Sequence, residues 1–95
     1  MKHCIIAKFN DTVGDKAAMI DRVEALFSSA PAMDGIHGHT VLRNCIDREN
    51  RYDLAIVIDM DKAALPAWDA SELHREWKSR FGSYLASKAI FDFEC

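Results

Sequence analysis

The chain has 95 residues, of which 49% are hydrophobic and 28% are charged, and its formal net charge at pH 7 is −3. This composition is typical of one globular domain over residues 1–95, and a chain of this length buries only about two-thirds of its unfolded surface, so it often gains stability by dimerising. The negative charge argues against binding to nucleic acids or anionic membranes, because phosphate groups are bound by clustered Lys and Arg.

The cysteines and the N-terminal segment predict a cytoplasmic protein. Cys4, Cys45 and Cys95 are odd in number and form no CxxC pair, which favours free thiols over disulfides or a thiolate metal site. The apolar run Cys4–Ala7 is followed at once by Lys8, so it is too short for a signal peptide. No window approaches the roughly 20 apolar residues of a membrane span.

Residues 2–9 (KHCIIAKF) are predicted to form the first strand. Because side chains alternate between the two faces of a strand, His3, Ile5 and Ala7 share one face, and Cys4 lies on the other. Both faces are apolar at the centre of the segment. This pattern predicts a strand in the middle of a sheet, covered on both sides.

A helix is predicted from Asp15 to about Ser29, and Pro31 and Gly35 close it. Apolar residues recur in it at three- and four-residue spacing, which is typical of a helix face packed on a core. The predicted buried stripe consists of Met19, Ile20, Val23, Leu26, Phe27 and Ala30.

The next two segments are predicted strands joined by a loop over residues 47–51. Residues 35–46 contain two glycines and many polar side chains, as an edge strand does. His37 and His39 alternate onto one face of this strand, but no third ligand has a convincing spacing, so no metal site is expected. Residues 52–60 form the most hydrophobic run and are predicted to be a central strand.

The C-terminal part predicts a broken helix, a longer helix and an edge strand. Pro66 lies too deep for a straight helix over residues 61–70. Asp69 with Glu72 three residues later resembles a capping box, so a new helix is predicted to start there. The last strand is predicted over residues 89–95. The inward face of the new helix is predicted to carry Leu73, Trp77, Phe81 and either Tyr84 or Leu85.

This order of elements predicts an α+β fold of the ferredoxin-like (split βαβ) type. Right-handed crossovers then give a four-stranded antiparallel sheet of order 4-1-3-2, with both helices on one face. The other face would expose an apolar patch to water, so we expect a homodimer in which a second sheet covers it and closes a two-chain barrel. The patch would consist of either the Ile5/Leu54/Ile56 set or the Cys4/Ile6/Val57 set.

Short stretches spread along nearly the whole chain carry a family resemblance. They are Lys2-His3, Lys8-Phe9, Tyr52-Asp53-Leu54-Ala55, Leu73-His74 and the AIFDFE run at residues 89–94. Taken together and in this order, they resemble the stress-responsive A/B barrel (Dabb) domain family. The resemblance implies a ferredoxin-like fold that dimerises into a barrel. It also implies likeness to olivetolic acid cyclase, a member of this family that closes a linear polyketide by aldol condensation without a cofactor.

The resemblance further implies which residues form a site. His74 falls on the position of the cyclase's catalytic His, and His3 falls on that of another His that lines its pocket. Trp68 stands where the cyclase has its catalytic Tyr, and Ser71 stands where it has an additional His. His74 and His3 are therefore the candidate catalytic residues, and no cofactor is expected.

Chemistry supports the same two histidines. A neutral imidazole can take a proton from a carbon flanked by carbonyl groups near neutral pH. If His3 faces the helices, it shares a cavity with the helix that carries His74. The candidate ligand-binding residues around this cavity are Ile5, Ala7, Trp68, Trp77 and Phe81, although aromatic residues at helical spacing are also typical of a core.

Three classes of function stay open at this point. The favoured one is a homodimer that binds a small apolar or carbonyl-rich molecule between its sheet and its helices. A second is a cofactor-independent enzyme, similar to a polyketide cyclase or a monooxygenase, with His74 as general base. A third is a structural or assembly module without catalysis.

Overall fold

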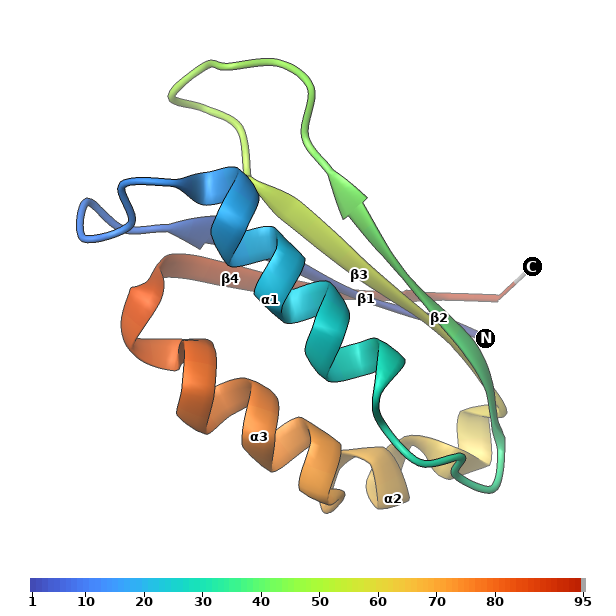
Figure 1. Ribbon diagram of the computed structural model, residues 1–95. Coiled ribbons are helices and arrows are strands. Elements are labelled where there is room, and N and C mark those ends of the chain that lie inside the picture. Colours follow the sequence, from blue (N-terminus) through green and yellow to red (C-terminus); the bar gives the residue numbers. More distant parts are fainter. Residues whose placement is uncertain (95) are drawn as a thin grey trace.

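A four-stranded antiparallel sheet forms one layer of the computed structural model, which describes residues 1–94, and helices cover one face of it (Figure 1). The strands are β1 (Lys2–Phe9), β2 (Ile36–Arg43), β3 (Leu54–Met60) and β4 (Leu85–Phe93), in the order β2-β3-β1-β4. The helices are α1 (Lys16–Ser28), α2 (Leu65–Asp69) and α3 (Glu72–Phe81), with 3₁₀ turns at Lys62–Ala64 and Gly82–Tyr84. Within residues 1–94, no helix combines the length and the apolar character needed to cross a membrane. Read from the other edge, the sheet order is 4-1-3-2, which confirms the predicted α+β topology.

The core lies between the helices and the two central strands. Ile5 of β1 is paired with Ile56 of β3, and Ala7 is paired with Leu54. All four side chains are buried, and burial of one Ile or Leu side chain contributes roughly 1.5–3 kcal/mol. The structure therefore decides a point that alternation alone left open, because the Ile5/Leu54/Ile56 set faces the helices.

The opposite face of the sheet is apolar at its centre and exposes several large side chains, although Cys4 itself is buried. Cys4 of β1 lies opposite Val57 on β3 and opposite Phe91 on β4, so these residues form a row across the sheet. Phe91, Phe93 and Leu42 have exposed fractions of 61%, 41% and 50%. We call the surface formed by these five residues the open face. An exposed apolar surface of this kind is typical of an interaction site.

Helix α1 is held at its start and along its outer side. Asp15 is the N-cap, and its Oδ1 accepts a hydrogen bond of 3.0 Å from the Ala18 backbone N–H, which confirms the predicted start to within one residue. Arg43 of β2 forms ion pairs of 2.5 Å with Asp21 and 3.1 Å with Glu24. The buried side of the helix consists of Met19, Ile20, Val23, Leu26 and Phe27, as its spacing predicts. Ala30, the last residue of the predicted stripe, lies beyond the end of α1 and is half-buried.

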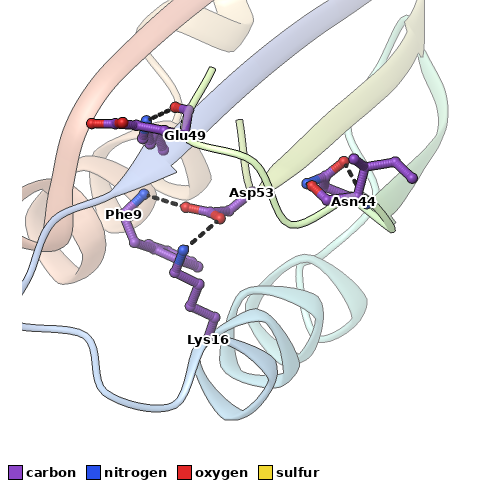
Figure 2. A network of polar contacts seen from close by, with 7 residues as sticks. Phe9, Lys16, Asn44, Glu49 and Asp53 are labelled. Carbon is purple, nitrogen blue, oxygen red and sulfur yellow. Dashed lines mark hydrogen bonds and ion pairs between the residues drawn. The ribbon is translucent and has the colours of Figure 1, made fainter. Parts of the chain in front are cut away.

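Asp53 joins three segments at the end of the sheet where β1 finishes and β3 begins (Figure 2). Its Oδ2 accepts a hydrogen bond of 2.8 Å from the Phe9 backbone N–H, and its Oδ1 is 3.0 Å from the Lys16 ammonium group. Its own backbone N–H donates to the Ala7 carbonyl over 2.8 Å. The carboxylate is only 12% exposed, so it ties the end of β1 and the start of α1 to the entry of β3.

The hairpin between β2 and β3 is longer than predicted. The Asn44 backbone N–H donates to the Asp53 carbonyl over 3.0 Å, and the Asn44 side-chain amide donates to the Ile46 carbonyl over 2.5 Å. The first bond joins the two ends of the loop, and the second lies inside it. The loop therefore comprises residues 44–53 instead of 47–51.

The predicted break in the segment before α3 is confirmed, but the predicted cap is wrong. Pro66 lies in the first turn of α2, where a missing N–H costs no helical hydrogen bond. Asp69 still belongs to α2, so its helical backbone cannot cap the next helix. Ser71 is the N-cap of α3 instead, with an extended backbone (φ −72°, ψ 155°) and an Oγ that accepts from the His74 N–H over 3.1 Å.

Strand β4 begins four residues earlier than predicted, at Leu85 instead of Ala89. The 3₁₀ turn after α3 reverses the chain quickly, so Leu85 already pairs with Phe9 at the end of β1. Cys95, the last residue of the predicted strand, lies outside the described residues.

Candidate functional site

Four residues form a row across the helix-covered face of the sheet. His39 of β2 is paired with Ile58 of β3, Ile58 is paired with His3 of β1, and His3 is paired with Asp92 of β4. Sheet pairing thus brings two imidazoles and a carboxylate from distant parts of the sequence onto one line. His3 faces the helices, which was the condition for its predicted role.

His3 is buried and has an acidic partner. Its Nδ1 atom forms a hydrogen bond with Oδ1 of Asp92, whose side chain is half-exposed. A buried imidazole is costly unless its nitrogens are hydrogen-bonded, so Asp92 stabilises His3 in this position.

Trp68 connects His3 with His74. The ring centroid of Trp68 is 6.3 Å from that of His3 in an edge-on arrangement and 5.3 Å from that of His74. Phe27 of α1 packs on the same indole at 6.2 Å. Among residues 1–94, no hydrogen bond joins His3 to His74, and the indole is the side chain that both of them contact.

The indole of Trp68 has an unused hydrogen-bond donor. The side chain is 1% exposed, and its Nε1–H has no hydrogen-bond partner among residues 1–94. The indole nitrogen can only donate, and a buried donor without an acceptor costs roughly 1–3 kcal/mol. Such a donor can be satisfied by an acceptor from outside the chain, either a water molecule or a ligand.

Trp68 lines a partly open pocket of about 190 Å³. The pocket lies at the end of the sheet where the loop after α1 approaches α2 (Figure 1). An engineered apolar cavity of about 150 Å³ holds benzene, so this space suits one ring or a short chain. We call it the Trp68 pocket. Its lining consists of Phe27, Ala30, Pro31, Ala32, Met33, Ile36, His37, Gly38, His39, Ile58, Trp68 and Leu73.

The other predicted ligand-binding residues lie elsewhere. The structure packs all four into the core, each with an exposed fraction of 1% or less, and the Trp68 pocket does not include them. These residues are Ile5, Ala7, Trp77 and Phe81.

His74 lies on the outer side of α3, beside a separate recess of about 420 Å³. Its Nδ1 donates to the Asp69 backbone carbonyl over 2.9 Å, since a carbonyl oxygen can only accept. This bond leaves Nε2 as the free nitrogen of the neutral ring, with a lone pair that can take a proton. The recess is also lined by Ser71, Arg75 and Lys78.

His37 and His39 lie at the Trp68 pocket, where the sequence indicated no ligand site. The register shifts between Ile36 and Gly38, so His37 occupies a β-bulge, and its Nε2 is 2.8 Å from Oδ1 of Asp61. The ring of His39 packs on Phe27 with centroids 5.4 Å apart. Residues 1–94 contain no group of three or more His, Cys, Asp or Glu side chains arranged to hold a metal ion.

Two groups on the open side of the sheet, the Cys4 thiol of β1 and the Asp59 carboxyl of β3, have altered proton affinities. Burial raises the pKa of the Cys4 thiol above its ordinary value of 9.0, the Asp92 carboxylate raises it further, and Lys2 acts in the opposite direction. Asp59 lies 3.1 Å from the Lys2 ammonium group, and this hydrogen bond lowers the pKa of the Asp59 carboxyl. Cys4 is therefore a thiol, not a thiolate, at neutral pH.

Comparison with protein families gives one match that covers the whole chain. Residues 1–95 match the profile of the Stress Responsive A/B Barrel Domain. No curated protein sequence matches the chain.

Solved structures show the same fold at low sequence identity. A dimeric protein of unknown function with a ferredoxin-like fold from Bacteroides fragilis is 16% identical, with a TM-score of 0.81 over 99% of this chain and 94% of that one. A dimeric ferredoxin-like protein of unknown function from Thermobifida fusca is 20% identical, with a TM-score of 0.80 over 99% and 89%. A Dabb family protein from Mesorhizobium loti is 12% identical, with a TM-score of 0.72 over 99% and 94%. These similarities confirm the predicted ferredoxin-like fold.

Proposed function

Since the chain belongs to the stress responsive A/B barrel domain family, we propose that it is a homodimer that binds a small apolar or carbonyl-bearing molecule in the Trp68 pocket. The observation that carries this proposal is the buried, unpartnered Nε1–H of Trp68 beside an apolar pocket. The dimer and the ligand are supported by different faces of the sheet.

The open face supports the dimer. Phe91, Phe93 and Leu42 expose apolar surface beside Cys4 and Val57, and a second sheet laid on this face would remove that surface from water. The related proteins from Bacteroides fragilis and Thermobifida fusca are both described as dimeric. The Trp68 pocket lies on the other side of the sheet, so it stays outside the proposed interface.

The lining of the Trp68 pocket supports a small ligand with one acceptor oxygen. Most lining side chains are aliphatic or aromatic, and apolar contacts of this kind bind the hydrocarbon part of a ligand. The Trp68 Nε1–H would then donate to a carbonyl oxygen, which would remove the free-energy penalty of a buried donor without an acceptor. A ketone on a short hydrocarbon chain meets both requirements.

A titration with 2-octanone tests the ligand proposal. We expect the indole N–H resonance of Trp68 in a proton–nitrogen correlation spectrum to move during the titration, because it gains an acceptor. The indole resonance of Trp77 is the internal reference, since Trp77 is buried in the core and does not line the pocket. Trp68→Phe should weaken 2-octanone binding by about tenfold, the usual worth of one hydrogen bond. Equal movement of both resonances, or of neither, would contradict the proposal.

A cofactor-independent enzyme is the second candidate, and the hydrogen bond from His74 to Asp69 favours it. That bond orients the imidazole and leaves Nε2 free to act as a general base, as the family resemblance suggested. His3, held by Asp92 on the other side of Trp68, lines neither the recess beside His74 nor the Trp68 pocket, so it would act on this site only by positioning the indole.

Hydrogen–deuterium exchange separates the enzyme from the binding protein. His74 lines the separate recess, so as a general base it would remove a proton from the carbon next to the carbonyl of 2-octanone bound in that recess, and deuterium would return from the solvent. If His74 acts in this way, His74→Ala should slow protein-catalysed exchange by about 100-fold while the fold is retained. Binding without any catalysed exchange would leave the binding function alone, and the absence of both would leave the third class, a structural or assembly module.

A further inference from the structure

We propose that His37 and His39 form a head-group site at the Trp68 pocket and that the ligand is a small carboxylic acid with an apolar chain. The chain would lie against the aliphatic and aromatic lining, and the carboxylate would be bound by the two imidazoles. This inference deepens the proposed function and rests on it.

The polar groups of the pocket are all hydrogen-bond donors or can become donors. Among residues 1–94, no Asp, Glu, Lys or Arg lines the pocket. The hydrogen-bonding side chains that do line it are His37, His39 and Trp68. An indole N–H only donates, and an imidazole donates from one nitrogen when neutral and from two when charged. In the described chain, the one carboxylate bonded to this set is that of Asp61, which binds His37 from outside the lining. The lining itself offers only donors, which suit a carboxylate better than an ammonium group.

His39 supplies the free donor. Neither of its ring nitrogens has a hydrogen-bond partner within the described part of the chain, and the ring is held by its contact with Phe27 at 5.4 Å. Its register position beside Ile58 points it to the helix-covered side of the sheet. A neutral His39 therefore offers one N–H to a ligand oxygen in either tautomer.

The orientation of His37 depends on a close contact between Gly35 and the segment that carries Asp61. Gly35 has a positive φ of 77°, and a Cβ at this position would lie 2.8 Å from the Cβ of Ala64, so glycine is required here. The Gly35 carbonyl accepts a hydrogen bond of 2.7 Å from the Asp61 backbone N–H. This contact holds the Asp61 carboxylate next to Nε2 of His37, which donates to it. The remaining nitrogen, Nδ1, donates to a ligand carboxylate when the imidazole is charged.

A second acceptor on the ligand would complete the site. If the carboxylate lies at the imidazoles, the Nε1–H of Trp68 remains available for another oxygen further along the chain. The chemistry therefore fits an oxo acid best and a simple carboxylic acid next.

Comparison of octanoate with 2-octanone tests this head-group site in the full chain. We expect octanoate to bind about tenfold more tightly than 2-octanone, because hydrogen bonds to a charged group are stronger than those to a neutral one. His39→Phe keeps an aromatic ring against Phe27 but removes both nitrogens, so it should abolish the preference for octanoate and change 2-octanone binding by less than about twofold. His39→Gln, which restores a donor, should recover part of the preference.

Lys62→Gln is the matched control. Lys62 is an exposed cation next to Asp61 that does not line the pocket, so its removal should leave the preference for octanoate unchanged. A preference that survives His39→Phe, or that disappears with Lys62→Gln, would overturn the head-group site while leaving the proposed function in place. If the unmodified protein binds neither probe, the proposed function fails as well.

Discussion

The Nδ1 atom of His3 on β1 is hydrogen-bonded to Oδ1 of Asp92, which lies directly opposite on the edge strand β4. The imidazole is buried, whereas the carboxylate is half-exposed, so the pair links the core beneath Trp68 to the edge of the sheet. Loss of either group would leave the other without its partner. The candidate site and the stability of the fold therefore share these residues.

Asp92→Ala should lower the free energy of unfolding by about 1–3 kcal/mol, because it leaves a buried imidazole without its acceptor. Chemical denaturation measures the change. Glu94→Ala is the control, since Glu94 is an exposed acid two residues further along and its nearest cation, Lys62, is 3.8 Å away. Equal effects of the two substitutions would show that the His3–Asp92 pair does not stabilise the fold.

Asp53→Ala should destabilise the protein by about 2–3 kcal/mol, since it removes a nearly buried acceptor shared by Phe9 and Lys16. Lys16→Gln removes the ammonium group alone and should cost less than about 1 kcal/mol, because that group is half-exposed. Thermal or chemical unfolding distinguishes the two. If Lys16→Gln lowers the free energy of unfolding as much as Asp53→Ala does, the hydrogen bond from the Phe9 N–H to Asp53 does not contribute most of the stabilisation.

Stability should fall at alkaline pH through Cys4. Burial raises the pKa of its thiol in the folded state, so above about pH 9 the unfolded chain ionises at Cys4 while the folded chain does not. The stabilisation is therefore complete below the ordinary pKa and is lost as the pH rises toward the raised one.

Urea unfolding across this alkaline range measures the effect of Cys4. Cys4→Ala should show a shallower loss of stability with pH than the unmodified chain does. Cys45→Ala replaces an exposed cysteine and should leave the slope unchanged. Parallel curves for all three proteins would exclude Cys4 as the titrating group.

Phe91→Glu should convert the proposed dimer to a monomer or weaken its dissociation constant by at least about tenfold, because it places a charge in the centre of an apolar interface. Sedimentation over a range of protein concentrations measures the change. Ile90→Glu is a matched control, since Ile90 is also 50% exposed but its partner in β1 is Ile5, on the helix-covered side. An unmodified chain that sediments as a monomer at every concentration would refute the dimer.

Much of the fold follows from short-range patterns. The alternation around Ile5 and Ile56 predicts two central strands, and the spacing of Val23 and Phe27 predicts the buried side of α1. These predictions succeed because periods of two and of 3.6 residues decide locally which side chains face a common core. Segment ends were less predictable, as at Ser71, because a cap depends on where the preceding turn finishes.

Much less of the candidate site could be predicted. The sequence marked Trp68, His3 and His74, but a resemblance cannot show that the indole contacts both rings. Gly38 is a weak local signal for the β-bulge at His37, but only the pairing with β3 shows that the bulge places His37 beside Asp61. The pocket itself is formed by segments that are far apart in the chain.

The amino-acid order by itself determined the type of each main element, because hydrophobic periodicity is a local property of the chain. The sheet order followed from the sequence of elements together with right-handed crossovers. The tertiary structure decided which apolar set faces the helices and how His39, Ile58, His3 and Asp92 align in one row. It also decided that a buried indole N–H remains without an acceptor. These features depend on pairing between residues that are distant in sequence, and periodicity within a segment carries no information about such pairing.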